Sequence, residues 1–332
     1  MNERPCPDCQ ENTVDRREFV KFAGATTLAA GTLAAGAALP LLNVAQSAHA
    51  TEESTSETTG KQLYDSMTPE QRKIICMPVD HKLRFRINAN WAVTEPAIGS
   101  DFYTDDQRKL IDKFVHDTTS GDGYELLQKQ MRADAPKGFD SYHIAIFGQP
   151  SDKAFQVELT GRHLTLRSDG NNKDNTAFGG PIVYGHGESD PKRNLFHYQT
   201  KRVNEVFQAL DVDQAKQALV AKSPPEARVK TQGPNGSFPG VSVGSLSPDQ
   251  KELVESVLKT LLAPYREQDV KEVFRVLKAT GGLNNLHMAF FQDKDLNDDK
   301  VWDTWRVEGP SFVWHFRGAP HVHAYINIGI KG

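Results

Sequence analysis

The sequence predicts an α+β fold, in which helices pack around a mixed or antiparallel sheet. Segments with helical periodicity and segments rich in β-forming residues follow one another without the regular β-α-β alternation of a doubly wound sheet. The sequence contains no G-x-G-x-x-G or Walker-type loop, so it does not indicate a Rossmann fold. With 332 residues, the chain is long enough to bury one large hydrophobic core.

Three segments have the pattern of a capped helix N-terminus, in which a hydroxyl residue stands three positions before a glutamine. They are residues 68–71, 104–107 and 247–250. After the third, apolar residues recur at helical spacing until Pro264 ends the helix. Another helix is predicted over residues 270–277, before Gly281 and its glycine neighbour, and a further helical region over residues 196–220.

The predicted strands lie between and after these helices. They are residues 142–147, 154–166, 301–305 and 312–330. Gly161 interrupts the second stretch and is expected to mark a bulge or a tight bend, which can redirect side chains near a site. Residues 232–244 are rich in glycine, proline and serine, and they are predicted to form a long surface loop or a lid.

The N-terminus has the pattern of an export signal. Arg16 and Arg17 are followed by Lys21, and no charged residue then occurs before Glu52. The uncharged stretch is rich in Ala, Gly and Thr and ends with small residues at positions 48–50. This arrangement resembles a twin-arginine translocation signal, which implies that the twin-arginine export machinery is a partner. Because that route exports folded proteins, often with a cofactor already inserted, it also favours a bound metal or cofactor.

The alternative to an export signal is a retained transmembrane helix, since the uncharged stretch is long enough to span a bilayer. Its weakly apolar composition and Pro40 favour cleavage instead. We therefore predict a signal peptide over residues 1–50, a disordered spacer over residues 51–61 and a single α+β domain over residues 62–332. The expected location is periplasmic or extracellular, with no stable membrane span after cleavage.

Charge and cysteine content exclude several classes of protein. The formal net charge is only −4, and nothing indicates the basic surface that a nucleic-acid partner requires. Cys6 and Cys9 lie in the expected leader, so that only Cys76 remains, within an apolar run typical of a buried thiol. The sequence therefore predicts neither a nucleic-acid-binding protein nor a disulfide framework.

The last predicted strand carries the strongest candidate for chemistry. His321 and His323 fall on one face of that strand together with Tyr325 and Asn327. Two imidazoles at positions i and i+2 can reach one metal ion. The spacing is similar to the His-x-His element of cupins, but the glutamate that cupins place shortly afterwards is absent. The alternative interpretation is an ordinary polar face on an edge strand.

Two further histidines can complete such a site. His163 follows Gly161 in the second strand stretch, and His186 lies in a Gly-His-Gly-Glu loop. We predict that His163, His321 and His323 bind a divalent transition metal, with His186 as a possible fourth ligand. Three imidazoles suit zinc, copper or iron, and the sequence does not distinguish among these metals.

A site with three protein ligands leaves a position for water or a small-molecule substrate, as in catalytic metal sites. Glu158 or Glu188 is then the candidate general base, and Arg162 or Arg317 can stabilise a developing anion. This hypothesis describes a metal-dependent hydrolase or oxidoreductase. The alternative is a non-catalytic periplasmic protein that binds a metal or small ligand through the same histidines, with a closed shell of four ligands.

Several motifs resemble those of one family. Residues 155–166 are similar to its (W/F)-x-(W/V)-x-x-x-G-H-H-L-S-L signature, residues 180–185 to its T-P-x-F-x-G segment, and residues 308–312 and 321–323 to its G-P-x-x-x-E and H-x-H elements. This is the domain of unknown function 3500 family, which occurs largely in exported bacterial proteins. The resemblance covers residues 62–332 and implies the fold and the location of the site, but no reaction.

The chain departs from the family pattern at two places. Where the family commonly has a histidine pair, this chain has Arg162 followed by His163, so only the second histidine corresponds. The aromatic-Arg-Asp run that usually follows the last histidine is replaced by residues 325–327, Tyr-Ile-Asn. A ligand set that includes the first histidine of the pair is therefore not available here.

Overall fold

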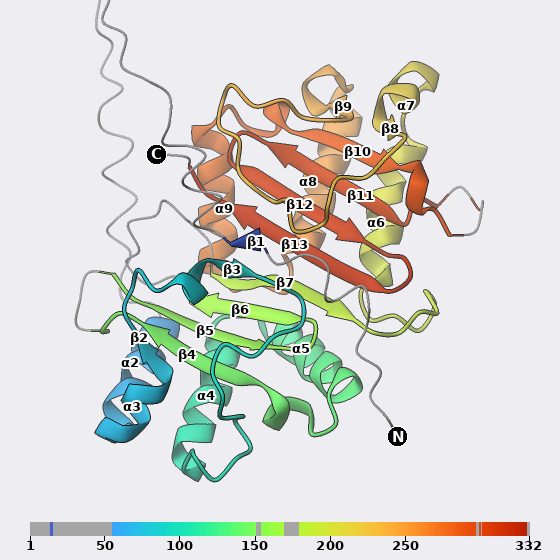
Figure 1. The fold of residues 1–332 in the computed structure, drawn as a ribbon. Coiled ribbons are helices and arrows are strands. Elements are labelled where there is room, and N and C mark those ends of the chain that lie inside the picture. Colours follow the sequence, from blue (N-terminus) through green and yellow to red (C-terminus); the bar gives the residue numbers. More distant parts are fainter. Residues whose placement is uncertain are drawn as a thin grey trace, which may run out of the picture.

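The computed structural model describes residues 14–15, 55–150, 154–168, 179–296, 299 and 301–330. Helices pack around one 11-stranded mixed sheet, which confirms the predicted α+β class. Its strand order is β2-β4-β5-β6-β7-β13-β12-β11-β10-β8, with β9 also paired to β10 (Figure 1). Apart from residues 14–15, the expected leader lies outside the described residues.

The strands fall into two groups that meet at the centre of the sheet. The N-terminal group consists of β2 (Cys76–Met77), β4 (His143–Phe147), β5 (Gln156–Gly161), β6 (Leu164–Ser168) and β7 (Gly180–His186). The C-terminal group consists of β8 (Leu219–Val220), β9 (Val241–Ser242), β10 (His287–Phe291), β11 (Thr304–Gly309), β12 (Phe312–Arg317) and β13 (Val322–Ile328). Separately, β1 (Val14–Asp15) pairs with β3 (Arg86–Ile87).

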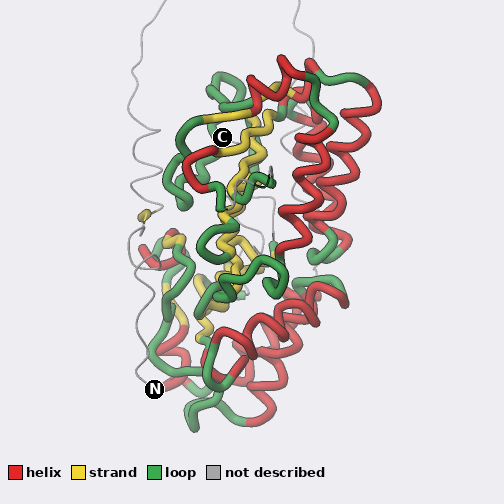
Figure 2. Tube along the Cα trace, turned by 90° about the vertical axis from the view of Figure 1, so that its right-hand side faces the viewer, coloured by secondary structure: helices red, strands yellow, loops and turns green. Residues whose placement is uncertain are grey.

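The helices accompany the strands in the same two groups. The first group is α2 (Thr55–Ser66), α3 (Pro69–Ile75), α4 (Asp105–Asp117) and α5 (Gly121–Asp134). The second is α6 (His197–Gln208), α7 (Val212–Ala218), α8 (Pro248–Leu262) and α9 (Glu267–Ala279). Long helices of both groups lie on one face of the sheet, and much of the other face is covered by loops (Figure 2).

The two groups repeat one arrangement. In each, two helices lead into a short strand, two further helices follow, and four antiparallel strands complete the unit. The short strands β2 and β8 both pair in parallel with the first long strand of their own group. The strands β7 and β13, each the last of its group, pair with one another and so join the two units into one sheet.

Helix capping shows the repeat in atomic detail. The capping boxes predicted at Thr68, Thr104 and Ser247 are all present, and a fourth begins at Asp211. In the first unit the amides of Gln71 and Gln107 donate to one another at 2.9 and 3.0 Å. In the second unit Gln214 and Gln250 make the same reciprocal pair at 3.2 and 2.8 Å. Each pair ties together the N-termini of two helices whose own backbone donors it helps to satisfy.

One segment differs from the sequence prediction, and another agrees with it but is held more firmly than a lid would be. Where we predicted a disordered spacer over residues 51–61, the described part of that segment lies in α2, with Ser56 and Thr59 buried. Residues 232–244 do form a long loop with little regular structure. However, Gln232 donates to Glu308 at 2.9 Å and the Gly233 N–H donates to the Pro310 carbonyl, so the start of this loop is anchored to the sheet.

One large hydrophobic cluster fills the space between the sheet and the helices. Trp305 and Trp314 are fully buried in it, and Trp305 stacks on Phe316 with ring centroids 4.8 Å apart. Burial raises the pKa of the Cys76 thiol to about 11, although Arg72 opposes the shift, as expected for an unreactive thiol. Within the described chain, no helix is both long enough and apolar enough to cross a membrane.

The stretch predicted to bend at Gly161 is a hairpin with a two-residue turn. Gly161 pairs with Leu164, so Arg162 and His163 form the turn between β5 and β6. A Cβ at Gly161 would overlap the ring of Tyr142, whose hydroxyl donates to the Arg162 carbonyl at 2.6 Å. Glycine therefore allows the Tyr142 ring to pack directly beneath the turn.

We expect Gly161→Ala to destabilise the protein by about 2 kcal/mol, because Tyr142 must move to admit the methyl group. Gly121→Ala is the matched control, since a Cβ at that helix position meets no atom within 4 Å. Its free energy of unfolding should change by less than about 0.5 kcal/mol. Urea denaturation measures both changes, and equal stability of the two variants would contradict this account of the turn.

Candidate metal centre

His163 occupies the second position of the β5–β6 turn. It has a φ of 54°, the only positive value among the described non-glycine residues, and its N–H donates to the Ala89 carbonyl at 2.6 Å. Histidine tolerates this left-handed conformation better than a β-branched residue does. The turn projects the imidazole from the end of the hairpin, whereas the neighbouring Leu164 is buried in the core.

His321 and His323 come from the connection between β12 and β13 and from β13 itself. His323 is paired in register with Arg317 on one side and with Gly185 of β7 on the other. The Nε2 atoms of His321 and His323 are 3.0 Å apart. The predicted His-x-His pair therefore presents both rings to one point.

The sheet register explains how the two parts of the site meet. Leu164 of β6 pairs with Tyr184 of β7, and Tyr184 pairs with Ala324 of β13. One residue further along each of these three strands, Gly185 therefore lies between His163 and His323. A Cβ at Gly185 would overlap the Val322 carbonyl oxygen and lie 3.2 Å from His323 Cδ2. The glycine leaves the space over which the two imidazoles approach each other.

The three histidines form a compact buried cluster. Their ring centroids lie 4.7 to 5.1 Å apart, and one ligand atom from each lies within 4.8 Å of the other two. Only His321 retains any measurable exposure, at 8%. Metal–nitrogen bonds of 2.0–2.1 Å place the nitrogens of a shared ion about 3.4 Å apart. The cluster can therefore hold a metal ion after a movement on the order of 1 Å.

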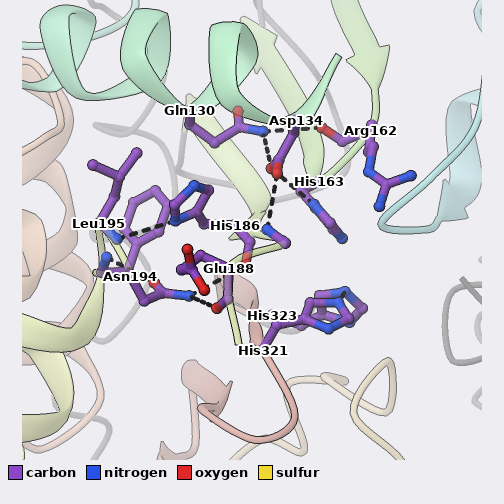
Figure 3. A network of polar contacts seen from close by, with 12 residues as sticks. Gln130, Asp134, Arg162, His163, His186, Glu188, Asn194, Leu195, His321 and His323 are labelled. Carbon is purple, nitrogen blue, oxygen red and sulfur yellow. Dashed lines mark hydrogen bonds and ion pairs between the residues drawn. The ribbon is translucent and has the colours of Figure 1, made fainter. Parts of the chain in front are cut away.

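Carboxylates contact two of these rings at Nδ1, the nitrogen on the side away from the cluster. Asp134, the last residue of α5, lies 2.8 Å from Nδ1 of His163 (Figure 3). Glu226, in the loop after β8, lies 3.2 Å from Nδ1 of His323. A carboxylate at Nδ1 fixes the ring orientation and leaves Nε2 for an ion, as is typical of metal-binding histidines. At His323 the Arg317 guanidinium also contacts Nδ1, at 2.9 Å, while Nε2 faces His321.

Asp134 is itself held by one donor of its own helix and by one from the segment after β7. The Gln130 amide donates to it at 2.8 Å and the Gly187 N–H at 2.9 Å. Burial acts to raise the pKa of Asp134, but its contact with His163 and these hydrogen bonds outweigh burial, so the pKa is lowered. The site therefore contains a carboxylate that stays ionised although it is largely removed from water.

The histidines of the β13 segment are kept neutral. Burial lowers the pKa of His321 to about 3, and the charges of His163 and Arg317 add to this effect. Burial also lowers the pKa of His323 far below its ordinary value, with Arg317 and His163 contributing. A neutral imidazole is the form that binds a metal, so these two rings need lose no proton first.

Two of the other predicted site residues lie beside the cluster. Arg317 places its Nη2 2.9 Å from Nδ1 of His323 and 3.5 Å from Nε2 of His321, and it forms a buried ion pair with Glu226 at 3.2 Å. Arg162 precedes His163 in the turn, and its positive charge contributes to the lowered pKa of both His321 and His323. Both guanidinium groups are thus within electrostatic reach of the cluster.

The structure does not bring the remaining predicted residues into the cluster. Glu158 lies in β5 opposite Arg167, three residue pairs and roughly 10 Å from the turn. Glu188 follows β7 and forms an ion pair with Arg193 at 2.5 Å. His186 accepts a hydrogen bond from the Leu195 N–H at 3.2 Å, and Figure 3 shows its ring on that side, away from the other histidines.

Sequence reasoning missed Asp134 and Glu226. Neither residue lies near a histidine in the chain, and no local motif marks either one. Asp134 ends a helix that we did not predict, and Glu226 lies in a proline-containing loop. Only the pairing of distant segments places these carboxylates behind the histidine rings.

We expect Asp134→Asn to lower the affinity for Zn²⁺ by roughly 10–100-fold, because the amide cannot supply the charge that favours a metal-binding His163. Glu125→Gln is the matched control, since it removes an exposed carboxylate of the same helix, which pairs with Lys129. Competition with a chromophoric chelator measures both affinities. Equal affinities in the two variants would show that Asp134 has no influence on the ion.

Comparison with known families assigns the chain to one family. The profile of the family described as "Protein of unknown function (DUF3500)" matches residues 49–326, so the chain belongs to this family. The match includes His163, His321 and His323, and it confirms the resemblance found in the sequence motifs. No curated protein and no solved structure matches the chain.

Proposed function

We propose that this DUF3500 protein is an exported metalloprotein whose His163, His321 and His323 bind one divalent transition metal ion, either zinc, copper or iron. In this proposal the protein is a metal-dependent hydrolase or oxidoreductase that acts on a small molecule. The supporting observation is the convergence of three buried imidazoles from separate segments, two of them with a carboxylate at the outer nitrogen. In metal sites, imidazole nitrogens bind the ion and carboxylates hold the other ring nitrogen in the same way.

A purely structural role for the cluster is harder to reconcile with its burial. Ring nitrogens that are removed from water need partners. Among the described residues, Nδ1 of His163 and Nδ1 of His323 face carboxylates, and Nε2 of His321 faces Nε2 of His323. The 3.0 Å contact between Nε2 of His321 and Nε2 of His323 can be bridged by only one proton. An ion would satisfy these lone pairs together and would hold the three segments in place.

A catalytic site is favoured over a closed structural site by the number of ligands. Among the described residues, the cluster has three histidines and no fourth His, Cys, Asp or Glu within the same reach. A metal with an open position supplies an activated water or a Lewis acid to a substrate. Arg162 and Arg317 lie where they can stabilise negative charge that develops beside it.

The proposed general base is Glu188 or Glu158, and the geometry favours Glu188. Glu188 is partly exposed and lies two residues after His186, which ends β7, so that in this proposal it reaches the site if it releases Arg193. Glu158 is buried within a strand and hydrogen-bonds to Gln156 at 2.6 Å. His186 can become a fourth ligand only if its ring turns away from Leu195.

A second candidate function is metal or small-ligand binding without turnover. The observation that favours it is that neither proposed base contacts the histidine cluster. Such a protein would exchange its ion reversibly and would show a closed coordination shell. An open water position, detected by X-ray absorption spectroscopy, would instead support the enzyme.

Protein purified from its site of export should contain about one metal ion per chain. The ion should be lost in His321→Ala/His323→Ala, because a single remaining imidazole cannot retain it. His116→Ala is the control, since its side chain is 61% exposed on α4 and lies outside the cluster. Inductively coupled plasma mass spectrometry measures the metal content of the wild type, the double variant and the control. Absence of stoichiometric metal from the wild type, or its retention by the double variant, would refute the proposal.

Export by the twin-arginine route is part of the proposal and has its own test. Arg16→Lys/Arg17→Lys should leave a folded full-length precursor in the cytoplasm, because lysine cannot reproduce the planar donor pattern of arginine. Arg4→Lys should be exported normally, since Arg4 lies outside the arginine pair. Cell fractionation with mass spectrometry of the N-terminus distinguishes the two outcomes. Normal export of the double-lysine variant would exclude the twin-arginine pathway.

A further inference from the structure

Arg162 is the charged residue of the histidine site that the fold leaves without a carboxylate. Resting on the function proposed above, we propose that the ligand of this centre is a small oxyanion, a carboxylate or a phosphate, which binds the ion and the Arg162 guanidinium together. Arg162 would thus determine specificity by selecting anionic over neutral ligands.

The charges around the cluster support this inference. Arg317 forms an ion pair with Glu226, and Asp134 supplies the only other carboxylate in contact with a cluster histidine among the described residues. These two carboxylates therefore balance the two guanidinium groups, and a divalent ion would add two charges that no described residue compensates. A buried excess of positive charge is costly unless an anion accompanies it.

The position of Arg162 directs that anion to the open side of the cluster. Its carbonyl accepts hydrogen bonds from Tyr142 at 2.6 Å and Gln130 at 3.1 Å, so the backbone from which the side chain extends is firmly held. A Cβ built at Gly187 would lie 3.0 Å from Oδ1 of Asp134, 3.4 Å from Cε1 of His163 and 3.7 Å from Nη2 of Arg162. The Asp134 carboxylate is already bound by His163 and by the Gly187 N–H. The guanidinium and the ring therefore border one spot beside the exposed Gly187.

The side chain of Arg162 is available for a ligand. No described residue forms an ion pair with it, and its Nε has no hydrogen-bond partner within the described chain. In contrast, Arg317 already forms an ion pair with Glu226 and a polar contact with His323. The planar fork of arginine matches the two oxygens of a carboxylate or phosphate, and these charge-assisted bonds are stronger than bonds to a neutral ligand.

The test uses the complete mature protein, which is loaded with zinc and then freed of unbound zinc. Inorganic phosphate, acetate and the neutral analogue acetamide are titrated calorimetrically. We expect saturable binding of phosphate or acetate and none of acetamide. Arg162→Gln should weaken oxyanion binding by roughly tenfold or more, and Arg162→Lys by less, because it retains the charge but loses the fork. Arg275→Gln, an exposed position on α9 paired with Glu272, should bind as the wild type does.

Metal content measured in the same samples separates this inference from the proposed function. If Arg162→Gln retains its zinc and loses oxyanion affinity, the inference holds, and preference for phosphate or for acetate identifies the kind of anion. If the variant retains both zinc and oxyanion affinity, or if the loaded wild type binds neither anion, the inference is wrong while the metal site stands. If the wild type cannot be loaded with zinc, the proposed function itself fails.

Discussion

The pairing of β7 with β13 is the contact on which the rest of the site depends. It joins the two repeating units into one sheet, and its register places Gly185 between His163 and His323. A shift of this register by one residue would turn His323 to the opposite face and separate it from the β5–β6 turn. The histidine cluster therefore exists only because two units, each with its own helices and strands, meet in one specific alignment.

The repeat also shows what is particular to the candidate metal centre. The turn between β11 and β12 corresponds to the turn between β5 and β6, and Gly309 packs against Leu286 as Gly161 packs against Tyr142. In place of the contact between Asp134 and His163, the second unit has a hydroxyl pair, Thr280 and Ser311, at 2.7 Å. The scaffold is thus shared by both units, whereas of the two corresponding turns only the one between β5 and β6 carries a charged side chain and an imidazole.

Local patterns in the sequence predicted the helices and strands well. The features that they did not predict depend on contacts between residues that are distant in the chain. The capped helix starts at Thr68, Thr104 and Ser247 depend on neighbours a few residues away, and all three are confirmed. The segment at α2 resembled a disordered spacer because its own composition is polar. Its stability comes from distant partners, such as the Thr59 hydroxyl that donates to Asp117 at 2.6 Å. The α+β class was predictable, whereas the repeat was hidden by divergence between the units.

The carboxylates behind the histidines illustrate the limit of local reasoning. Asp134 and Glu226 reach the cluster from segments that are far from His163 and His323 in the chain, so the donor set is complete only when both units have folded together. An ion bound there would stabilise the native state over the unfolded chain, because no unfolded conformation presents the same ligands. A site built in this way couples metal binding to the assembly of the whole sheet. It would thus be filled most readily in a chain that has already folded, which is the state that a twin-arginine export route would require.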